Sequence, residues 1–482
     1  MNGALRVMKF GGTSLGDAQR IRGAAEIVAQ AAQIGPVVTV VSAMAGVTNS
    51  LVAAAEKSAG GDAKAAARLA DQLTARHREA VEALLPDRVK RETLLSELAG
   101  LIEQAADFCR GCALLGELTP RTMDAIAGTG ERLSARIFAA ALDALEIRAL
   151  ALDATQLIVT DEVHGAANPL ADPTREKTRA ALLPLLAEKI TPVVTGFIAA
   201  TAKGVSTTLG RGGSDYSATL LGAALGASEV IIWTDVDGVL TADPRIVPDA
   251  VPLEEISYAE AADLAFFGAK VLHPLALRPV AERGIPVWIR SSFEPHKPGT
   301  KISRSAAPRS CAVKGVTAIR GLSLLRVGGP GLAGKPEIAA KIFAATSSVR
   351  AQIVMIAQAS SQDNLCLAIR AAEAARTERA LRRSLAADMR HHQVEHITQM
   401  RDVAIVSVVG EEICGAPAIA GRLFSALGEE GIRVLAIAQG LADHNISCLV
   451  SADAADSAIA ALHHAFRLAQ RATPETAMAA AR

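Results

Sequence analysis

Short runs of mostly apolar residues alternate, along the first 300 positions, with longer segments in which apolar residues recur every three or four positions. The short runs predict buried strands, and the longer periodic segments predict helices. Strands that alternate with helices favour a mainly parallel sheet with helices on both of its faces. The expected strands cover residues 5–10, 36–42, 148–152, 192–197, 229–234 and 285–290.

The segment from about 63 to 125 keeps the helical period and carries many charges. We therefore expect a helical lobe inserted into an α/β domain that covers residues 1–300. Cys109 and Cys112 form a CxxC inside this lobe, without a second pair at the spacing of a zinc site. Buried thiols are accordingly favoured over metal or redox chemistry.

A polar stretch at 295–308, rich in proline, lysine and serine, predicts a domain boundary. Beyond it the sequence repeats itself, because residues 336–343 match 417–424 and later residues match at the same spacing. Each copy has the pattern of a small α+β unit, and two such units bury apolar faces by packing together. The expected units cover 313–400 and 401–472.

Composition and charge exclude several classes of protein. The 482 residues include 50 Lys and Arg against 50 Asp and Glu. This balance, without a basic arm or stripe, argues against a nucleic-acid partner. The first residues lack the apolar core of a signal peptide, and no uncharged run reaches membrane-spanning length. The six cysteines form no disulfide-scaffold pattern, which favours a reducing, cytoplasmic location.

Polar or glycine-rich turns follow the first two expected strands. Lys9 lies at the end of the first strand, and Gly11 and Gly12 separate it from a helix that starts near Leu15. Such a turn points backbone N–H groups at a bound anion, and Lys9 is within reach of a phosphate there. A surface lysine beside a tight turn is the alternative. The hydroxyl-rich loop 42–49 ends the second strand, where open α/β sheets place ligands.

The stretch 207–215 holds three glycines around Arg211, followed by Ser214 and Asp215 at the start of an apolar helical run. Glycines permit positive φ angles and let a ligand approach the main chain closely. Ser214 or Asp215 can cap the helix, and Arg211 can bind a carboxylate or phosphate with two hydrogen bonds. Taken alone, an ordinary glycine-rich loop is an equally good interpretation.

Six motifs occur in a fixed order, at 9–14, 42–49, 130–132, 207–215, 234–245 and 267–274. This set resembles the aspartokinase family of amino acid kinases, and the C-terminal repeat resembles the paired ACT domains of that family. The resemblance implies an αβα sandwich with a mainly parallel sheet, followed by two ferredoxin-like ACT domains. It also implies transfer of the γ-phosphoryl group of ATP to the β-carboxylate of L-aspartate, which begins lysine, methionine and threonine synthesis.

The resemblance also assigns roles to individual residues. An ionised carboxylate needs no general base, but positive charge must offset its repulsion from the triphosphate. Mg²⁺ is implied to be held mainly by ATP oxygens, so no residue is assigned as a metal ligand. The implied catalytic residues are Lys9, Asp215 and Lys270. The implied aspartate contacts are Arg211 for the α-carboxylate, Glu131 for the ammonium group, and Thr48, Phe197 and Ser214. The implied ATP contacts are Lys9, Gly11, Gly12, Ser14, Thr234, Asp235, Arg245 and Lys270.

The ACT pair implies feedback control by an amino acid, threonine or lysine, and a homodimer or higher homo-oligomer that forms through these domains. The implied effector contacts are Gln358, Asn364, Gln439 and Asn445, with amides bonded to edge-strand backbone as the alternative. The repeat most resembles the kinase part of bifunctional aspartokinase–homoserine dehydrogenases. Because the chain ends where a dehydrogenase would begin, we expect it to be monofunctional.

The sequence departs from the family pattern at two positions, and two rival functions remain open. Ala199 stands where a glycine is common, and Leu240 stands where some members have a nucleotide-contacting tyrosine. Another carboxylate kinase, such as acetylglutamate or glutamate kinase, is one rival, but those proteins lack paired ACT domains. The other is a non-catalytic amino-acid sensor, against which the presence of Lys9, Arg211, Asp215 and Lys270 argues.

Overall fold

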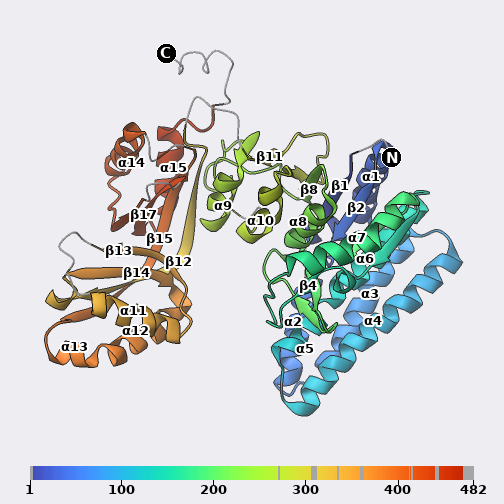
Figure 1. Cartoon of the computed structure of the whole chain (residues 1–482), viewed down its shortest axis with the longest axis horizontal. Coiled ribbons are helices and arrows are strands. Elements are labelled where there is room, and N and C mark those ends of the chain that lie inside the picture. The colour runs from blue at the N-terminus through green and yellow to red at the C-terminus, as the bar shows by residue number, and fades with distance from the viewer. Residues whose placement is uncertain are drawn as a thin grey trace. The chain divides into compact units, whose positions relative to one another are not determined.

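The computed structural model describes residues 4–269, 272–304, 312–333, 336–358, 363–411, 413, 416–439 and 444–470. Lys270 therefore lies outside the described residues. The chain divides into two compact units, drawn in Figure 1. Unit 1 takes its described residues from Met1–Val239, Pro252–Ala262 and Lys270–Ala307, and unit 2 takes them from Leu240–Val251, Asp263–Ala269 and Pro308–Arg482.

Unit 1 is built around an eight-stranded sheet. Its first six strands are parallel to one another, whereas β11 runs antiparallel to β10 and is joined by β9 in the same direction. This confirms the mainly parallel sheet predicted from the sequence. The strand order is β3 (Ala149–Leu152), β5 (Thr191–Thr195), β2 (Val37–Val41), β1 (Arg6–Phe10), β8 (Glu229–Thr234), β10 (Val287–Ser291), β11 (Thr300–Ser303) and β9 (Glu255–Ser257).

Alternation along the central strand β1 sends its side chains to two helical layers. Met8 and Phe10 join one apolar core, to which six helices contribute described residues. Val7 and Lys9 face the opposite layer, where α8 (Gly213–Leu225) lies against β1, with α7 (Ala171–Ala187) and α10 (Pro274–Arg283) beside α8. The six helices are α1 (Ala18–Ile34), α2 (Val47–Ala59), α3 (Ala65–Leu84), α4 (Arg88–Leu115), α5 (Pro120–Ala127) and α6 (Thr129–Ala144).

The helical lobe expected at 63–125 consists of α3, α4 and the short α5 (Pro120–Ala127), which pack with α2 (Figure 1). The sequence did not predict α2, because its first residues belong to the hydroxyl-rich segment interpreted as a loop. A small second sheet orders β4 (Val159–Thr160), β6 (Ile198–Thr201) and β7 (Ser206–Thr208), and β7 leads into the stretch around Arg211.

Unit 2 contains one six-stranded antiparallel sheet, ordered β13 (Ile353–Gln358), β14 (Asn364–Arg370), β12 (Gly315–Gly328), β15 (His396–Val409), β17 (Asn445–Ser451) and β16 (Ala436–Ala438). Its two long strands, β12 and β15, pair with each other along most of their length. Its helices are α11 (Pro336–Ser348), α12 (Ala371–Ser384), α13 (Ala386–Arg390), α14 (Pro417–Glu429) and α15 (Ala455–Ala465).

The two repeats share these long strands. One apolar core takes Leu325 from β12 and Ile397 from β15, and the other takes Val316 from β12 and Val406 from β15. Each long strand therefore serves both halves. The sequence predicted two packed α+β units, but it gave no sign that the units exchange strands in this way. In the part of the chain that is described, no helix is both long and apolar enough to cross a membrane.

Candidate active site

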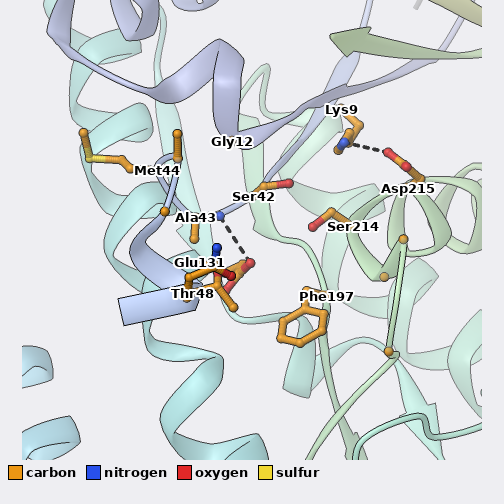
Figure 2. Close-up of a pocket in the computed structure, with 16 residues that line it drawn as sticks. Lys9, Gly12, Ser42, Ala43, Met44, Thr48, Glu131, Phe197, Ser214 and Asp215 are labelled. Carbon is orange, nitrogen blue, oxygen red and sulfur yellow. Dashed lines mark hydrogen bonds and ion pairs between the residues drawn. The ribbon is translucent and has the colours of Figure 1, made fainter. Parts of the chain in front are cut away.

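Lys9 and Asp215 form an ion pair at one end of a cavity of about 370 Å³ in unit 1, with Nζ 2.6 Å from Oδ1 (Figure 2). Lys9 faces α8 because of its place in the β1 alternation, and Asp215 lies in the first turn of α8. Their side chains are only 10% and 13% exposed. The register of one strand against one helix thus places a fixed cation, with its counter-ion, at the carboxyl end of the central strands.

The glycine turn after β1 is tightly packed. A Cβ on Gly12 would lie 2.8 Å from the carbonyl oxygen of Ala43, so glycine is needed there. Gly12 lines the cavity. Gly11 donates its N–H to the carbonyl of Trp233 at 3.2 Å, and Ser14 is buried with its hydroxyl 2.7 Å from that of Ser292. Of the predicted phosphate contacts in this turn, the structure thus brings Lys9 and Gly12 to the cavity.

Glu131 lies in the first turn of α6, lines the cavity and is only 3% exposed. Its Oε1 accepts a hydrogen bond from the backbone N–H of Ala43 at 3.2 Å, whereas Oε2 has no hydrogen-bond partner among the described residues. Burial raises the pKa of Glu131 to about 7, against the opposing effect of the Ala43 N–H. A buried carboxylate with one free oxygen suits an ammonium group, which would satisfy that oxygen and favour ionisation.

The predicted loop 42–49 instead passes through Gly46, in the left-handed conformation with φ of 82°, into the first turn of α2. Thr48 lines the cavity from this turn. Asn49 and Met44 line it as well, although sequence reasoning gave them no individual role. Their position inside the predicted motif was the available signal. Figure 2 shows Thr48 close to Glu131, on the side of the cavity away from Lys9.

Arg211 stands between Gly210 and Gly212, which both have a φ of 72°. Its side chain is exposed and does not line the cavity, whereas both glycines do. A Cβ on Gly212 would lie 2.6 Å from the Cβ of His273, so the loop packs closely against the start of α10. Burial, and then the charge of Arg211, lower the pKa of His273. The neutral imidazole caps α10 by accepting the N–H of Leu275 at 3.4 Å.

Phe197 and Ser214 both line the cavity, as the sequence predicted. Phe197 has a φ of 66°, which is unusual for a bulky residue. The surrounding contacts hold it there, because its N–H is donated to Ser217 Oγ at 3.0 Å and its carbonyl accepts the N–H of Leu209 at 2.9 Å. Such strained backbone is concentrated at ligand sites.

Among the described residues, three more predicted nucleotide contacts, Thr234, Asp235 and Arg245, do not line this cavity. Thr234 ends β8, the neighbour of β1, and Asp235 follows it; the Thr234 hydroxyl donates to Asp235 Oδ1 at 3.2 Å. Arg245 belongs to unit 2, where it pairs with Asp243. The described residues include no group of three or more His, Cys, Asp or Glu side chains suited to a metal ion.

The predicted effector residues lie in unit 2, and their two asparagines have different partners. Asn364 accepts from Arg326 Nε at 2.7 Å, whereas Asn445 donates to Asp263 Oδ2 at 2.9 Å. Asn445 also lines a cavity of about 300 Å³ with Asp263 and residues of β13, β15, β16 and β17. Gln358 and Gln439 are exposed. Equivalent positions of the repeat have therefore diverged in their contacts.

Comparisons with known proteins agree with this architecture. Residues 4–291 match the amino acid kinase family, and residues 325–385 and 406–466 each match an ACT domain. A bifunctional aspartokinase/homoserine dehydrogenase of Haemophilus influenzae is 36% identical over 96% of this chain and 56% of its own length. Aspartokinase 1 of Arabidopsis thaliana, a chloroplastic protein, is 33% identical over 95% of this chain and 80% of its own length. The chain spans about half the length of the bifunctional relatives that it matches.

Solved structures of aspartokinases are also similar to this chain over nearly its whole length. Escherichia coli aspartokinase III in complex with aspartate and ADP, in the R-state, has a TM-score of 0.78 and 31% identity, covering 96% of this chain and 99% of its own. The same enzyme in complex with lysine and aspartate, in the T-state, has a TM-score of 0.76 and 30% identity, with coverage of 95% and 99%.

Proposed function

This chain belongs to the aspartokinase family of amino acid kinases, and on that premise we propose that it transfers the γ-phosphoryl group of ATP to the β-carboxylate of L-aspartate. The product is 4-phospho-L-aspartate. One observation carries the proposal: a single cavity presents the Lys9–Asp215 ion pair and the buried, half-satisfied carboxylate of Glu131. The related E. coli structure with aspartate and ADP supports a site for both reactants.

The reaction brings an ionised carboxylate toward a polyanion, so its main obstacle is electrostatic repulsion. Lys9 neutralises charge on the transferring phosphoryl group, and Asp215 holds the ammonium of Lys9 in place. The nucleophile is already ionised near neutral pH and requires no general base. Lys270, Thr234, Asp235, Gly11, Gly12, Ser14 and Arg245 are the further nucleotide contacts proposed from the family resemblance.

The amino-acid headgroup is bound by two opposite charges. Glu131 takes the ammonium group through its free Oε2, and Arg211 takes the α-carboxylate. The side chain of Arg211 is exposed beside the cavity. To reach the α-carboxylate, it turns inward when aspartate binds. Thr48 and Ser214 add hydrogen bonds, and Phe197 forms a wall.

Magnesium is expected to bind mainly through ATP oxygens, as in many phosphoryl-transfer sites. The acidic side chains of the cavity, Asp215 and Glu131, are respectively paired with Lys9 and buried against Ala43. Because both carboxylates are already engaged, they suit a metal ion that binds mainly to the nucleotide better than one that is coordinated mainly by protein side chains. When bound, the ion would neutralise phosphate charge beside Lys9.

The test is ADP release with L-aspartate, L-glutamate and N-acetyl-L-glutamate in parallel, with hydroxylamine present to trap an acyl phosphate. We expect release and trapping with aspartate alone. Release with glutamate or N-acetylglutamate instead would identify another carboxylate kinase, and no release with any of them would favour a non-catalytic sensor.

Regulation is the second part of the proposal. The ACT pair makes this chain an amino-acid-regulated kinase, with threonine or lysine as the effector, and the E. coli structure with lysine supports an effector of this class. We propose Gln358, Asn364, Gln439 and Asn445 as effector contacts, a homodimer or larger homo-oligomer through the ACT domains, and a cytoplasmic location. An effector acts only by binding two states of the protein with different affinities. Titration of each amino acid against the initial rate, with chromatography and light scattering for the oligomer, tests these points.

A further inference from the structure

Asp124 is a buried carboxylate in α5 that lies outside the cavity, and it is only 2% exposed. Its Oδ1 accepts a hydrogen bond from Thr208 Oγ1 at 2.5 Å, and its Oδ2 lies 2.8 Å from His164 Nδ1. The backbone N–H of Gly165 donates to both oxygens at 3.1 Å. A buried charge needs this degree of hydrogen bonding to be stable, so the arrangement fixes all three donors in place.

Two of these donors control the position of the Arg211 loop. Thr208 ends β7, three residues before Arg211. Its carbonyl accepts the N–H of Ala167 at 2.9 Å, and a Cβ on Gly210 would lie 3.1 Å from that of Ala166. The loop 164–167 therefore supports the Arg211 loop directly, and Asp124 holds both of them.

Asp124 also precedes Glu131 along the chain, one helix earlier. Its carbonyl accepts the N–H of Gly128 at 3.2 Å, where α5 ends and α6 begins. Gly128 packs closely against β6, because a Cβ there would lie 2.5 Å from Ile198 Cγ2. Glu131 follows in the first turn of α6. Asp124 thus lies between the segment that carries Glu131 and the segment that carries Arg211.

We propose that Asp124 is a positioning residue that sets the distance between Glu131 and Arg211, and through it the selection of α-amino acids. The inference rests on the proposed function, in which these two side chains bind the ammonium and α-carboxylate groups. Those groups have a nearly fixed separation in every α-amino acid, so a displaced partner weakens binding even when both charges are present. Asp124 sets this distance without touching the substrate.

The primary test is Thr208→Val, which removes the hydroxyl donor and keeps the shape of the side chain. The Asp124 carboxylate then loses one of its donors and the segment that carries Arg211 loses a contact that holds it, so we expect the KM for aspartate to rise by about ten- to a hundredfold. The KM for ATP should change by less than about twofold, since Lys9 and Asp215 are not tethered to Asp124. Thr208→Ser, which keeps the hydroxyl, should restore most of the aspartate affinity.

Thr178→Val is the matched control. Thr178 is also fully buried, and its hydroxyl donates only to the backbone carbonyl of Leu157, at 3.4 Å. The same substitution there should lower thermal stability while leaving the KM for aspartate unchanged. If Thr178→Val raises that KM as much as Thr208→Val does, the effect is a general loss of stability and the positioning role is wrong.

A double-mutant cycle asks whether Thr208 acts through Arg211. In an Arg211→Ala background, Thr208→Val should raise the KM for aspartate by less than about twofold, because the group that it positions is gone. Full additivity would overturn the proposal. Asp124→Asn is the stronger variant, for which a thermal melt first shows whether the protein folds, and Thr208→Val decides the matter if it does not.

The proposed function and this inference fail in different ways. A wild-type chain without aspartate-dependent ADP release would contradict the function. A wild-type chain that turns over aspartate, together with a Thr208→Val variant of unchanged aspartate KM, would contradict only the role of Asp124.

Discussion

The ammonium of Lys9 lies 2.6 Å from the carboxylate of Asp215, and both side chains are largely buried at the end of one cavity. The pair joins the central strand β1 to the first turn of α8. It keeps a cation ready in the absence of substrate, because a charge of this burial is stable only when it is paired. An arriving phosphoryl group meets a lysine whose position is already set.

Lys9→Met should abolish most turnover, with kcat reduced on the order of a hundred- to a thousandfold, because no cation then offsets the charge on the phosphoryl group. The measurement is kcat by coupled ADP release. Lys9→Met should also destabilise the fold by about 3 kcal/mol, because Asp215 is left without its partner. The double variant Lys9→Met/Asp215→Asn should recover part of that loss, and equal stability of the single and double variants would show that the pair is not coupled.

Glu131→Gln should stabilise the protein at neutral pH. The folded-state pKa of Glu131 is raised from 4.5 to about 7. The contribution of Glu131 to the free energy of unfolding is therefore complete below about pH 4.5, and it is lost as the pH rises through 7. A shift of that size corresponds to about 3 kcal/mol. Urea melts at pH 5 and pH 8 should show a variant advantage that grows with pH. The exposed Glu56→Gln is the control, and an advantage that is equal at both pH values would contradict the explanation.

The KM for aspartate should fall as the pH rises from 6 to 8. Only the ionised form of Glu131 binds an ammonium group well, and burial holds its pKa at about 7 in the empty site. Because the ionised fraction increases about tenfold over this range, the KM should decrease by a similar factor. The KM for ATP measured over the same range is the control. A flat profile for aspartate would show that Glu131 does not bind the ammonium group.

Gly212→Ala should weaken aspartate binding and destabilise the protein. The residue has a φ of 72°, and its new Cβ would lie 2.6 Å from the Cβ of His273, so the Arg211 loop must move. Gly226→Ala, at the other end of α8, is the matched control, because it has a φ of 67° and open space around the new Cβ. That variant should be destabilised only by the cost of placing alanine in the left-handed conformation, about 1–2 kcal/mol. An unchanged aspartate KM in Gly212→Ala would argue against a binding role for this loop.

Local patterns predicted the elements of unit 1 well. The expected strand at 229–234 has the same bounds as β8, and the strand at 5–10 differs from β1 by one residue. The helix α2 escaped prediction because Ser, Thr and Asn favour loops and caps in isolated sequence, whereas here Gly46 turns the chain and packing completes the helix. Local preference was overruled by burial of one helical face.

The residues of the candidate site were likewise predicted only in part. Lys9, Thr48, Glu131, Ser214 and Asp215 were all identified from motifs, and the structure brings them to one cavity. Asp124 was not identified, since a single aspartate in a charged helical segment carries no local signal. Its partners His164, Gly165 and Thr208 come from distant parts of the chain, so only the folded structure reveals its environment.

The α/β class, the repeat and the set of charged residues around the glycine turns could be predicted from the order of residues, because they depend on side-chain period and composition over short stretches. Three features become visible only in the folded chain: Lys9 is paired with Asp215, Glu131 is buried with a free oxygen, and the two ACT halves share β12 and β15. These features depend on strand register and on contacts between residues far apart in the chain. Their energy comes from desolvation and pairing in three dimensions, which no local pattern records.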